Sequence, residues 1–185
     1  MRRLLDAGVQ VFETRGYHAA RVDDIVKLAR TSHGTFYLYF SNKEDLFRAL
    51  AEDVGDALQS LAESMPQLGP DGDGRAALRQ WVIKFADLYA EYGAIVRAWT
   101  EAEIGTHEFG RLGTEVFTRF TLTFTERISG SLPKRVDPAI AALALVAMLE
   151  RMNYYVLSKQ VRVKREEMID TLTDVMHASL FGARR

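Results

Sequence analysis

The chain has 185 residues, of which 48% are apolar, and a formal net charge of −1, which together predict a globular protein with a real core. The absence of cysteine excludes disulfide scaffolds, thiolate metal sites and cysteine nucleophiles, and fits a reducing cytoplasm. We expect no membrane partner, because the start shows no signal-peptide pattern and the longest apolar run, Ala139–Leu149, has 11 residues where a span needs about 20.

Helical periodicity and capping residues predict four helices in the first third of the chain. Apolar residues recur on one helix face up to Phe12, and Gly16 is a natural stop for this helix. A short second helix is predicted over 22–29. Ser32 is a good N-cap for a third over 33–39, and Asn42 is a good N-cap for a long helix over about 43–65.

The rest of the chain is also predicted to be helical. Residues 66–74 have the Pro- and Gly-rich composition of a linker, and helices are then expected from aromatic stripes, from an apolar segment over 139–158 and from a final segment over about 165–181. No alternating strand pattern is present. We therefore predict an all-α fold of about nine helices, with a DNA-binding domain over 1–50 and a second domain over 51–185.

Two short helices that follow a supporting helix and meet at a tight break predict a helix-turn-helix. In that geometry the second short helix enters the DNA major groove with its N-terminal residues at the base edges. Residues 1–50 carry eight Lys and Arg against six Asp and Glu, so the weakly basic end of the chain is the one with this pattern. Phe36 and Phe40, four residues apart, are expected to hold the helix against its neighbours, which leaves Tyr37 free to reach a phosphate.

These first 50 residues resemble the DNA-binding domain of the tetracycline-repressor-like (TetR) transcription regulators. The resemblance rests on fixed spacings through Arg15-Gly16-Tyr17, then Val22-Asp23-Asp24-Ile25-Val26, then Ser32-x-Gly34-Thr35-Phe36-Tyr37-x-Tyr39-Phe40-x-x-Lys43-Glu44-Asp45-Leu46. Beyond residue 50 it rests on length and helix pattern alone. The alternative, that 32–40 is only a small aromatic helix of a helical core, does not explain Gly34, Thr35 and Lys43 at their spacings.

The resemblance implies which residues contact double-stranded DNA. Base contacts are expected from Ser32, His33, Gly34, Thr35 and Leu38, and phosphate contacts from Tyr37, Tyr39, Lys43 and Arg21. For His33 a solvated surface position is the alternative.

Two positions depart from the family pattern. Arg21 stands where the family usually has the Thr or Ser that caps the second helix, and this costs a cap worth about 1 kcal/mol. Arg30 stands where the turn usually has glycine, so we expect it to adopt the conformation that glycine takes there, and it is a candidate for an added DNA contact.

The family's C-terminal helices bind a small molecule, and aromatic residues are concentrated where such a pocket would lie. We expect a lipophilic or aromatic effector to be held by rings and oriented by a few polar groups. The predicted ligand-binding residues are Trp81, Phe85, Tyr89, Tyr92, Trp99, Phe117, Phe120, Thr121, Phe124, Glu150 and Asn153. The alternative is that these rings simply fill a core.

A homodimer is the other expectation, because reading a palindromic operator requires two recognition helices about one turn of DNA apart. The apolar, alanine-rich segment 139–149 and the final helix resemble the family's four-helix dimer interface, although an ordinary core helix would have the same composition. The predicted interface residues are Ala142, Leu145, Val146, Met168, Leu172, Val175 and Met176.

No stretch of the sequence has the residue spacing of a known enzyme or metal-binding motif. Asp71-Gly72-Asp73-Gly74 begins like a calcium loop, but its twelfth position is Val82, and His107-Glu108 lacks the second histidine of a zincin. We therefore predict a cytoplasmic, homodimeric, ligand-responsive transcription regulator that is a repressor, with no metal, cofactor or catalytic site. Two alternatives remain open: a helical carrier or enzyme with a vestigial DNA-binding domain, and a DNA-binding protein that responds to no ligand.

Overall fold

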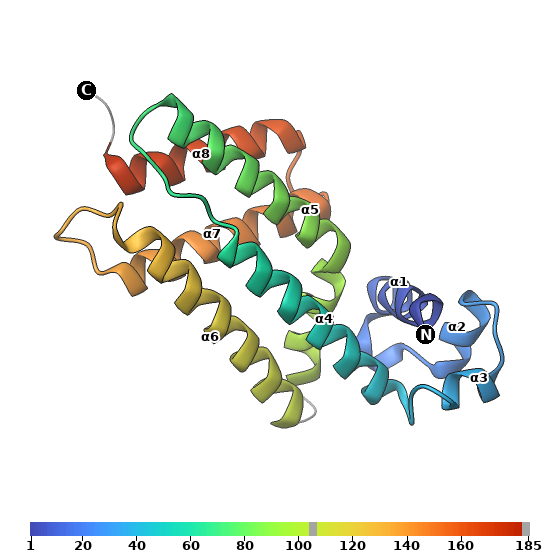
Figure 1. Cartoon of the computed structure of the whole chain (residues 1–185). Coiled ribbons are helices and arrows are strands. Elements are labelled where there is room, and N and C mark those ends of the chain that lie inside the picture. Colours follow the sequence, from blue (N-terminus) through green and yellow to red (C-terminus); the bar gives the residue numbers. More distant parts are fainter. Residues whose placement is uncertain (104–106, 183–185) are drawn as a thin grey trace. The chain divides into compact units, whose positions relative to one another are not determined.

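The computed structural model describes residues 1–103 and 107–182, with the side chains of 97–103 and 107–109 outside the description. The described residues form eight α-helices and no strand, which confirms the all-α class with one helix fewer than predicted (Figure 1). They are α1 (Arg2–Ala19), α2 (Val22–Leu28), α3 (His33–Tyr37), α4 (Lys43–Glu63), α5 (Gly72–Glu103), α6 (His107–Ser129), α7 (Pro138–Leu157) and α8 (Arg165–Phe181).

The chain divides into two compact units, each made of two stretches of sequence. Unit 1 comprises Met1–Asp56 and Tyr92–Val116, and unit 2 comprises Ala57–Glu91 and Phe117–Arg185. Three helices, α4, α5 and α6, contribute residues to both units. A division at residue 50 stays a prediction about the DNA-binding domain.

The capping residues predicted from the sequence set the helix ends of unit 1. Gly16 has φ 73°, a left-handed conformation that interrupts α1 where the stop was expected. Ser32 Oγ accepts a hydrogen bond from the backbone N–H of Thr35 and so caps α3. Asn42 Oδ1 accepts one from the N–H of Asp45, 2.8 Å away, at the start of α4.

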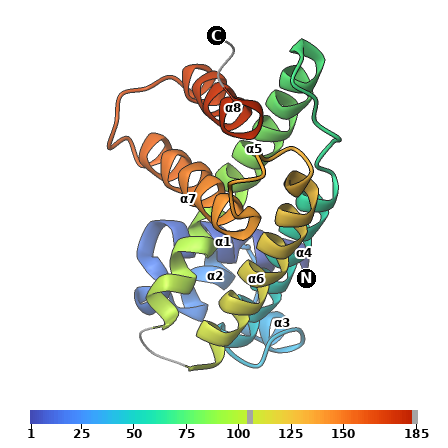
Figure 2. The ribbon, with the colours of Figure 1, turned by 90° about the vertical axis from the view of Figure 1, so that its left-hand side faces the viewer.

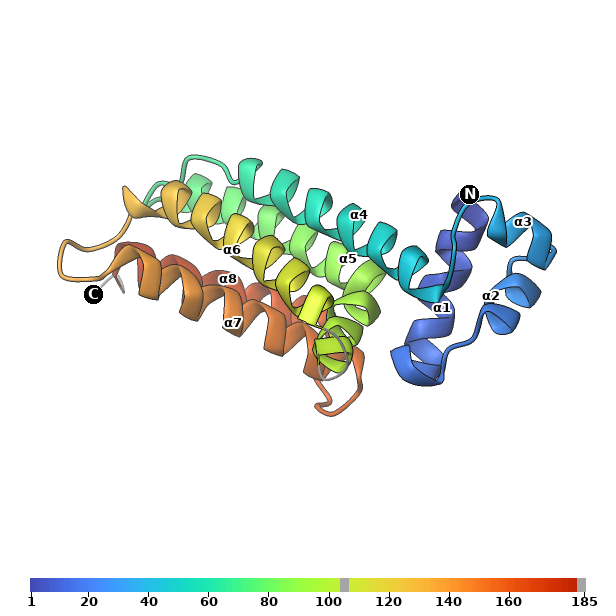
Figure 3. The ribbon, with the colours of Figure 1, turned by 90° about the horizontal axis from the view of Figure 1, so that it is seen from below.

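Aromatic rings form the core of unit 1. The rings of Phe12 and Phe47 meet edge to face with centroids 5.4 Å apart, and Tyr17 lies 4.9 Å from Phe47. Gly8 of α1 allows α4 to approach closely, because an added Cβ would lie 2.6 Å from a methyl carbon of Leu46. Helix α2 packs against both α1 and α3, so these three helices lie together as one group (Figure 3).

Ion pairs link α5 to α8 in unit 2, where the two helices lie side by side (Figure 2). Arg79 donates to Asp170 at 2.7 Å and to Glu166 at 2.8 Å, and Arg165 pairs with Asp87. Helix α7 packs against α8, and the Asp137 carboxylate caps its first turn. Among the described helices, α7 alone has the length and apolar composition of a membrane span, a test that core helices of soluble proteins also pass.

Candidate functional site

The segment made of α3 and the turn after it, residues 33–40, has one buried side and one side open to solvent. Phe36 is 0% exposed and contacts the ring of Phe40, also buried, at a centroid distance of 5.7 Å. Leu38, in contrast, is 80% exposed, and Tyr37 and Tyr39 are about half exposed. Exposing three large side chains in a row is unfavourable unless a partner covers them, and all three belong to the predicted DNA-contact set.

The two hydroxyls at the start of α3 contact each other. Ser32 Oγ and Thr35 Oγ1 lie 3.0 Å apart, and Ser32 Oγ also caps the helix through the Thr35 N–H at 3.1 Å. A base edge that bonds either hydroxyl must therefore share it with this cap or replace part of it. The base contacts of Ser32 and Thr35 stay predictions, and forming them would weaken the capping hydrogen bond of α3.

Gly34 and His33 differ in how the protein uses them. Among the described residues, an added Cβ at Gly34 would contact only Ser32 Oγ, at an ordinary 3.6 Å, so none of them requires a glycine there. That is the situation expected if an outside surface approaches this backbone. His33 Nε2 lies 2.6 Å from Asp23 Oδ1 of α2, a pairing that sequence reasoning missed because residues ten apart on two short helices share no pattern.

Lys43, a predicted phosphate contact, is bonded to the end of α1. Its ammonium donates to the backbone carbonyl of Tyr17 at 2.9 Å and lies 4.5 Å from the centre of the Tyr17 ring. The Tyr17 hydroxyl in turn donates to Glu44 at 3.3 Å, and burial together with this carboxylate raises the pKa of Tyr17 well above its usual range. An ammonium has three N–H donors, so Lys43 keeps donors for a phosphate while one holds it in place.

The two arginines that depart from the family pattern have the local structure expected of them. Arg21 is the N-cap residue of α2 and makes no side-chain capping bond, so the predicted loss of the cap is confirmed. Arg30 has φ 52°, the left-handed conformation that glycine adopts without strain.

Comparison with known proteins also indicates a helix-turn-helix transcription regulator. The family model described as bacterial regulatory proteins of the tetR family matches residues 4–50. The HTH-type transcriptional regulator EthR of Mycolicibacterium smegmatis is 28% identical over 189 residues, which cover 97% of this chain and 85% of that protein. Residues 4–50 form a DNA-binding domain of the TetR family.

Solved structures show that the whole chain has the TetR-family fold. A TetR-family regulator from Thermus thermophilus, PfmR, has a TM-score of 0.75 and 18% identity, covering 99% of this chain and all of that one. FadR from Bacillus subtilis, solved in complex with stearoyl-CoA, has a TM-score of 0.73 and 20% identity, covering 99% of both chains.

Five of the predicted ligand-binding rings pack together in unit 2. Trp81 stacks on Phe124 with centroids 5.3 Å apart, and Phe120 stacks on Phe124 at 6.0 Å. Phe85 contacts Phe120 at 6.4 Å and Tyr89 at 6.5 Å. All five rings are buried, so they form one continuous aromatic cluster shared by α5 and α6.

Two of the predicted polar groups, Glu150 and Asn153, lie on α7, and Glu150 contacts this cluster. The Tyr89 hydroxyl donates to Glu150 Oε1 at 2.9 Å, which connects the aromatic cluster to α7. Asn153 is buried, and its Nδ2 donates to the carbonyl of Leu149 one turn earlier. Both residues can offer a further polar atom to a bound molecule.

Three other predicted ligand-binding residues are not part of this cluster. Tyr92 belongs to unit 1, where it hydrogen-bonds Arg2 of α1. Phe117 is exposed, and Thr121 donates its hydroxyl to the Phe117 carbonyl on their own helix. The side chain of Trp99 lies outside the described residues.

The predicted dimer residues lie on the buried face of their helices. Six of the seven are buried within one chain, and only Val175 is exposed. Helix α7 has an opposite stripe at i, i+3, i+4 and i+7 whose members are all exposed: Ile140, Leu143, Ala144 and Ala147. The choice of α7 and α8 as the interface helices stays a prediction, but the face open to a second copy is this stripe. Both faces of α7 are apolar in sequence, so the sequence alone could not show which face is buried in the core and which is exposed.

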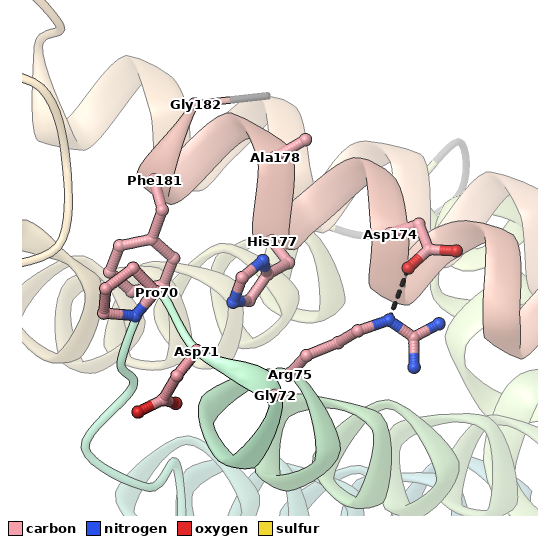
Figure 4. Close-up of a pocket in the computed structure, with 9 residues that line it drawn as sticks. All are labelled: Pro70, Asp71, Gly72, Arg75, Asp174, His177, Ala178, Phe181 and Gly182. Carbon is pink, nitrogen blue, oxygen red and sulfur yellow. Dashed lines mark hydrogen bonds and ion pairs between the residues drawn. The ribbon is translucent and has the colours of Figure 1, made fainter. Parts of the chain in front are cut away.

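A separate cavity of about 240 Å³ lies between the linker, the start of α5 and the end of α8 (Figure 4). Arg75 donates to Asp174 across it at 2.6 Å, and this hydrogen bond lowers the pKa of Asp174. His177 Nε2 lies 3.0 Å from the carbonyl oxygen of Gly69, and the His177 ring contacts Phe181. These contacts tie the linker to α8, and none of the residues is in the predicted ligand-binding set.

Proposed function

We propose that this TetR-family regulator is a homodimeric repressor that leaves a palindromic operator when a lipophilic molecule binds. The observation that carries the proposal is the exposed row Tyr37, Leu38 and Tyr39, which runs from the last residue of α3 into the turn after it, while Phe36 and Phe40 anchor this segment in the core. Such a segment is held rigid on one side and presents a complete face on the other, which is what insertion into a major groove requires. In this proposal the place of action is the cytoplasm.

The aromatic cluster supports an apolar effector. Its five rings, Trp81, Phe85, Tyr89, Phe120 and Phe124, offer a wide apolar surface, and Glu150 and Asn153 supply polar atoms on the neighbouring helix. FadR of Bacillus subtilis has the same fold and was solved with stearoyl-CoA, a molecule with a long apolar chain. A fatty acyl thioester is therefore the first effector class to test, and a ligand would enter by separating rings that touch in the described structure.

The exposed stripe of α7 supports the dimer. Ile140 is 69% exposed, and with Leu143, Ala144 and Ala147 it forms an apolar surface that is costly to leave in water. The alanines allow a second helix to come close. Val175 of α8 is also exposed, so the pair α7 and α8 from two copies would make a four-helix interface.

Release by ligand requires that the two states differ in ligand affinity. We infer that the effector prefers a dimer in which the helix starting at Lys43 has pivoted, which changes the spacing of the two recognition helices. To shift an equilibrium from 1:99 to 99:1, the effector must bind the released state about 10⁴-fold more tightly, or about 5.5 kcal/mol. An effector that bound both states equally would leave the operator occupied.

The proposal is tested by adding stearoyl-CoA to the complex of the protein with fluorescent operator DNA, with coenzyme A alone as the control. The expected result is a loss of anisotropy with stearoyl-CoA and none with coenzyme A. If neither this thioester nor free stearate releases DNA, and neither raises the melting temperature, the acyl-chain effector class is wrong.

A further inference from the structure

A hollow of about 300 Å³ on unit 1 lies between the first half of α1 and the turn that precedes the recognition helix. It is lined by Arg3, Asp6, Ala7, Gln10, Leu28, Ala29 and Arg30. Its rim carries two guanidinium groups and one side-chain amide, all of them hydrogen-bond donors. The only acid of this lining, Asp6, is bonded to Arg2 at 2.9 Å, so its charge is already compensated.

The two arginines of the hollow stand out because no described residue pairs with them. Neither Arg3 nor Arg30 forms an ion pair or side-chain hydrogen bond within residues 1–103 and 107–182, whereas Arg2 and Arg15, on the same helix as Arg3, pair with Asp6 and Asp24. Two unpaired guanidiniums beside a hollow repel each other unless an anion joins them. Their planar donor groups match a phosphate better than any other common anion.

The backbone conformation of Arg30 is an independent indication that the arginine has a binding role. The N–H of Arg30 donates to Lys27 and that of Thr31 donates to Val26, which is the Schellman pattern that ends α2. The residue in the left-handed position of this pattern is usually glycine, and any other L-residue is strained there. Arginine stands at this position with φ 52°, so the chain keeps a cation where glycine would be more stable.

The position of this turn in the DNA complex follows from helix-turn-helix geometry. The first residues of the recognition helix, Ser32 and His33, lie at the base edges, and the walls of the groove are the phosphate backbones. Arg30 comes two residues before Ser32 and therefore lies where the chain passes the groove wall. The hollow opens beside it.

We propose that the hollow is a seat for one DNA phosphate in each half-site, gripped by Arg3 and Arg30 with Gln10 as a further donor. This inference rests on the proposed DNA-binding function and extends the interface beyond the recognition helix and the predicted contacts of Arg21 and Lys43. The contact would strengthen binding to every sequence alike, because a phosphate carries no base information.

The test compares two glycine variants that relieve the same strain. Lys159 is the second non-glycine residue with positive φ, at 56°, among the described residues, and it closes the same Schellman pattern at the end of α7. We expect Arg30→Gly and Lys159→Gly each to raise the melting temperature by about 2–4 °C. In a salt series of operator binding, Arg30→Gly should reduce the slope by about 0.9 per half-site, and Lys159→Gly should leave it unchanged.

Two further measurements locate the contact. Arg3→Gln should reduce the slope as Arg30→Gly does, and Arg30→Lys should restore most of it. Operators with single neutral methylphosphonate links should reveal one position per half-site that weakens the wild type and leaves Arg30→Gly unaffected. The phosphate seat would be overturned if Arg30→Gly kept the wild-type salt slope of operator binding, or if Lys159→Gly reduced this slope equally. A wild type that binds no DNA would instead overturn the proposed function.

Discussion

Lys43 and Tyr17 are held together by two contacts, a hydrogen bond of 2.9 Å from the ammonium to the Tyr17 carbonyl and a cation–π contact at 4.5 Å. They join the first residue of α4 to the end of α1. Any rotation of α4 must therefore move or break this pair. A residue predicted to touch DNA is thus also part of the contact that sets the position of the DNA-binding helices.

Lys43→Met is the first prediction, because it keeps the side-chain stem and removes the charge. We expect a loss of about 1 kcal/mol in unfolding free energy, from the hydrogen bond and the cation–π contact, and a fall of about 0.9 per half-site in the salt slope. Denaturant unfolding and a salt series measure the two effects. Tyr17→Phe is the matched control, since it keeps the carbonyl and the ring and should leave the salt slope unchanged.

Substitutions of Phe36 in α3 and of Leu38, the C-cap residue that follows α3, are expected to have opposite effects. Phe36→Ala should cost about 3–5 kcal/mol, because Phe36 is 0% exposed and its removal leaves a cavity in the core of unit 1. Leu38→Ala should leave stability within about 0.5 kcal/mol and instead change which operator sequences are preferred. Thermal unfolding and binding to a set of single-base operator variants check this pair. A large stability loss in Leu38→Ala would show that the exposed face has a structural role.

Tyr89 and Glu150 form the polar contact between the aromatic cluster and α7, with a hydrogen bond of 2.9 Å. Tyr89→Phe should cost about 1 kcal/mol, because it removes the hydroxyl that donates to Glu150 Oε1 and leaves this partly buried carboxylate only its ion pair with Arg151. If stearoyl-CoA binds at this cluster, the variant should also need more of it to release DNA. An unchanged release curve with a lowered stability would place the ligand elsewhere.

Arg75 and Asp174 give a pH-dependent prediction of modest size. The arginine lowers the pKa of Asp174, so the pair contributes stability above the unfolded pKa of about 3.9, and this contribution is lost as pH falls through the lower folded value. Both side chains are largely exposed, so Arg75→Ala should cost only about 0.5 kcal/mol at pH 7. The difference from the wild type in urea unfolding should shrink toward zero near pH 2. A difference that persists there would have to come from packing.

Ile140→Glu tests the interface proposed for α7. A charge at Ile140, the most exposed large side chain of the apolar α7 stripe, should convert the dimer to a monomer at micromolar concentration and abolish specific operator binding. Leu122→Glu on α6 is the matched control, since Leu122 is similarly exposed, at 61%, and lies outside the α7 stripe. Light scattering measures the oligomeric state of both variants. A dimeric Ile140→Glu variant would contradict this interface.

The sequence predicted the local structure of unit 1 well, because its signals are local. Ser32 and Asn42 cap the predicted helices, Gly16 interrupts α1, and Arg30 takes the left-handed conformation of the glycine it replaces. Each of these outcomes depends on residues within four positions along the chain. Periodicity and capping are therefore sufficient to predict them.

The relationships that the sequence did not predict join distant residues or distinguish two similar faces. Lys43 and Tyr17 are 26 residues apart, and nothing in the pattern of either helix indicates that they meet. On α7 the buried stripe through Ala142 and the exposed stripe through Ile140 are both apolar, so composition could not tell core from surface. Tyr92 was grouped with the other aromatic residues by spacing, although its partner is Arg2 of α1.

The most direct test of the central claim is a selection of the purified protein against random double-stranded DNA, followed by anisotropy of the selected sequence across a salt series. The account predicts enrichment of a palindrome and an affinity that falls steeply with salt, by about 0.9 log units per log unit of salt for each phosphate neutralised. Enrichment of no sequence, with equal weak binding to all DNA, would contradict an operator-specific repressor and leave this fold in some role other than operator recognition.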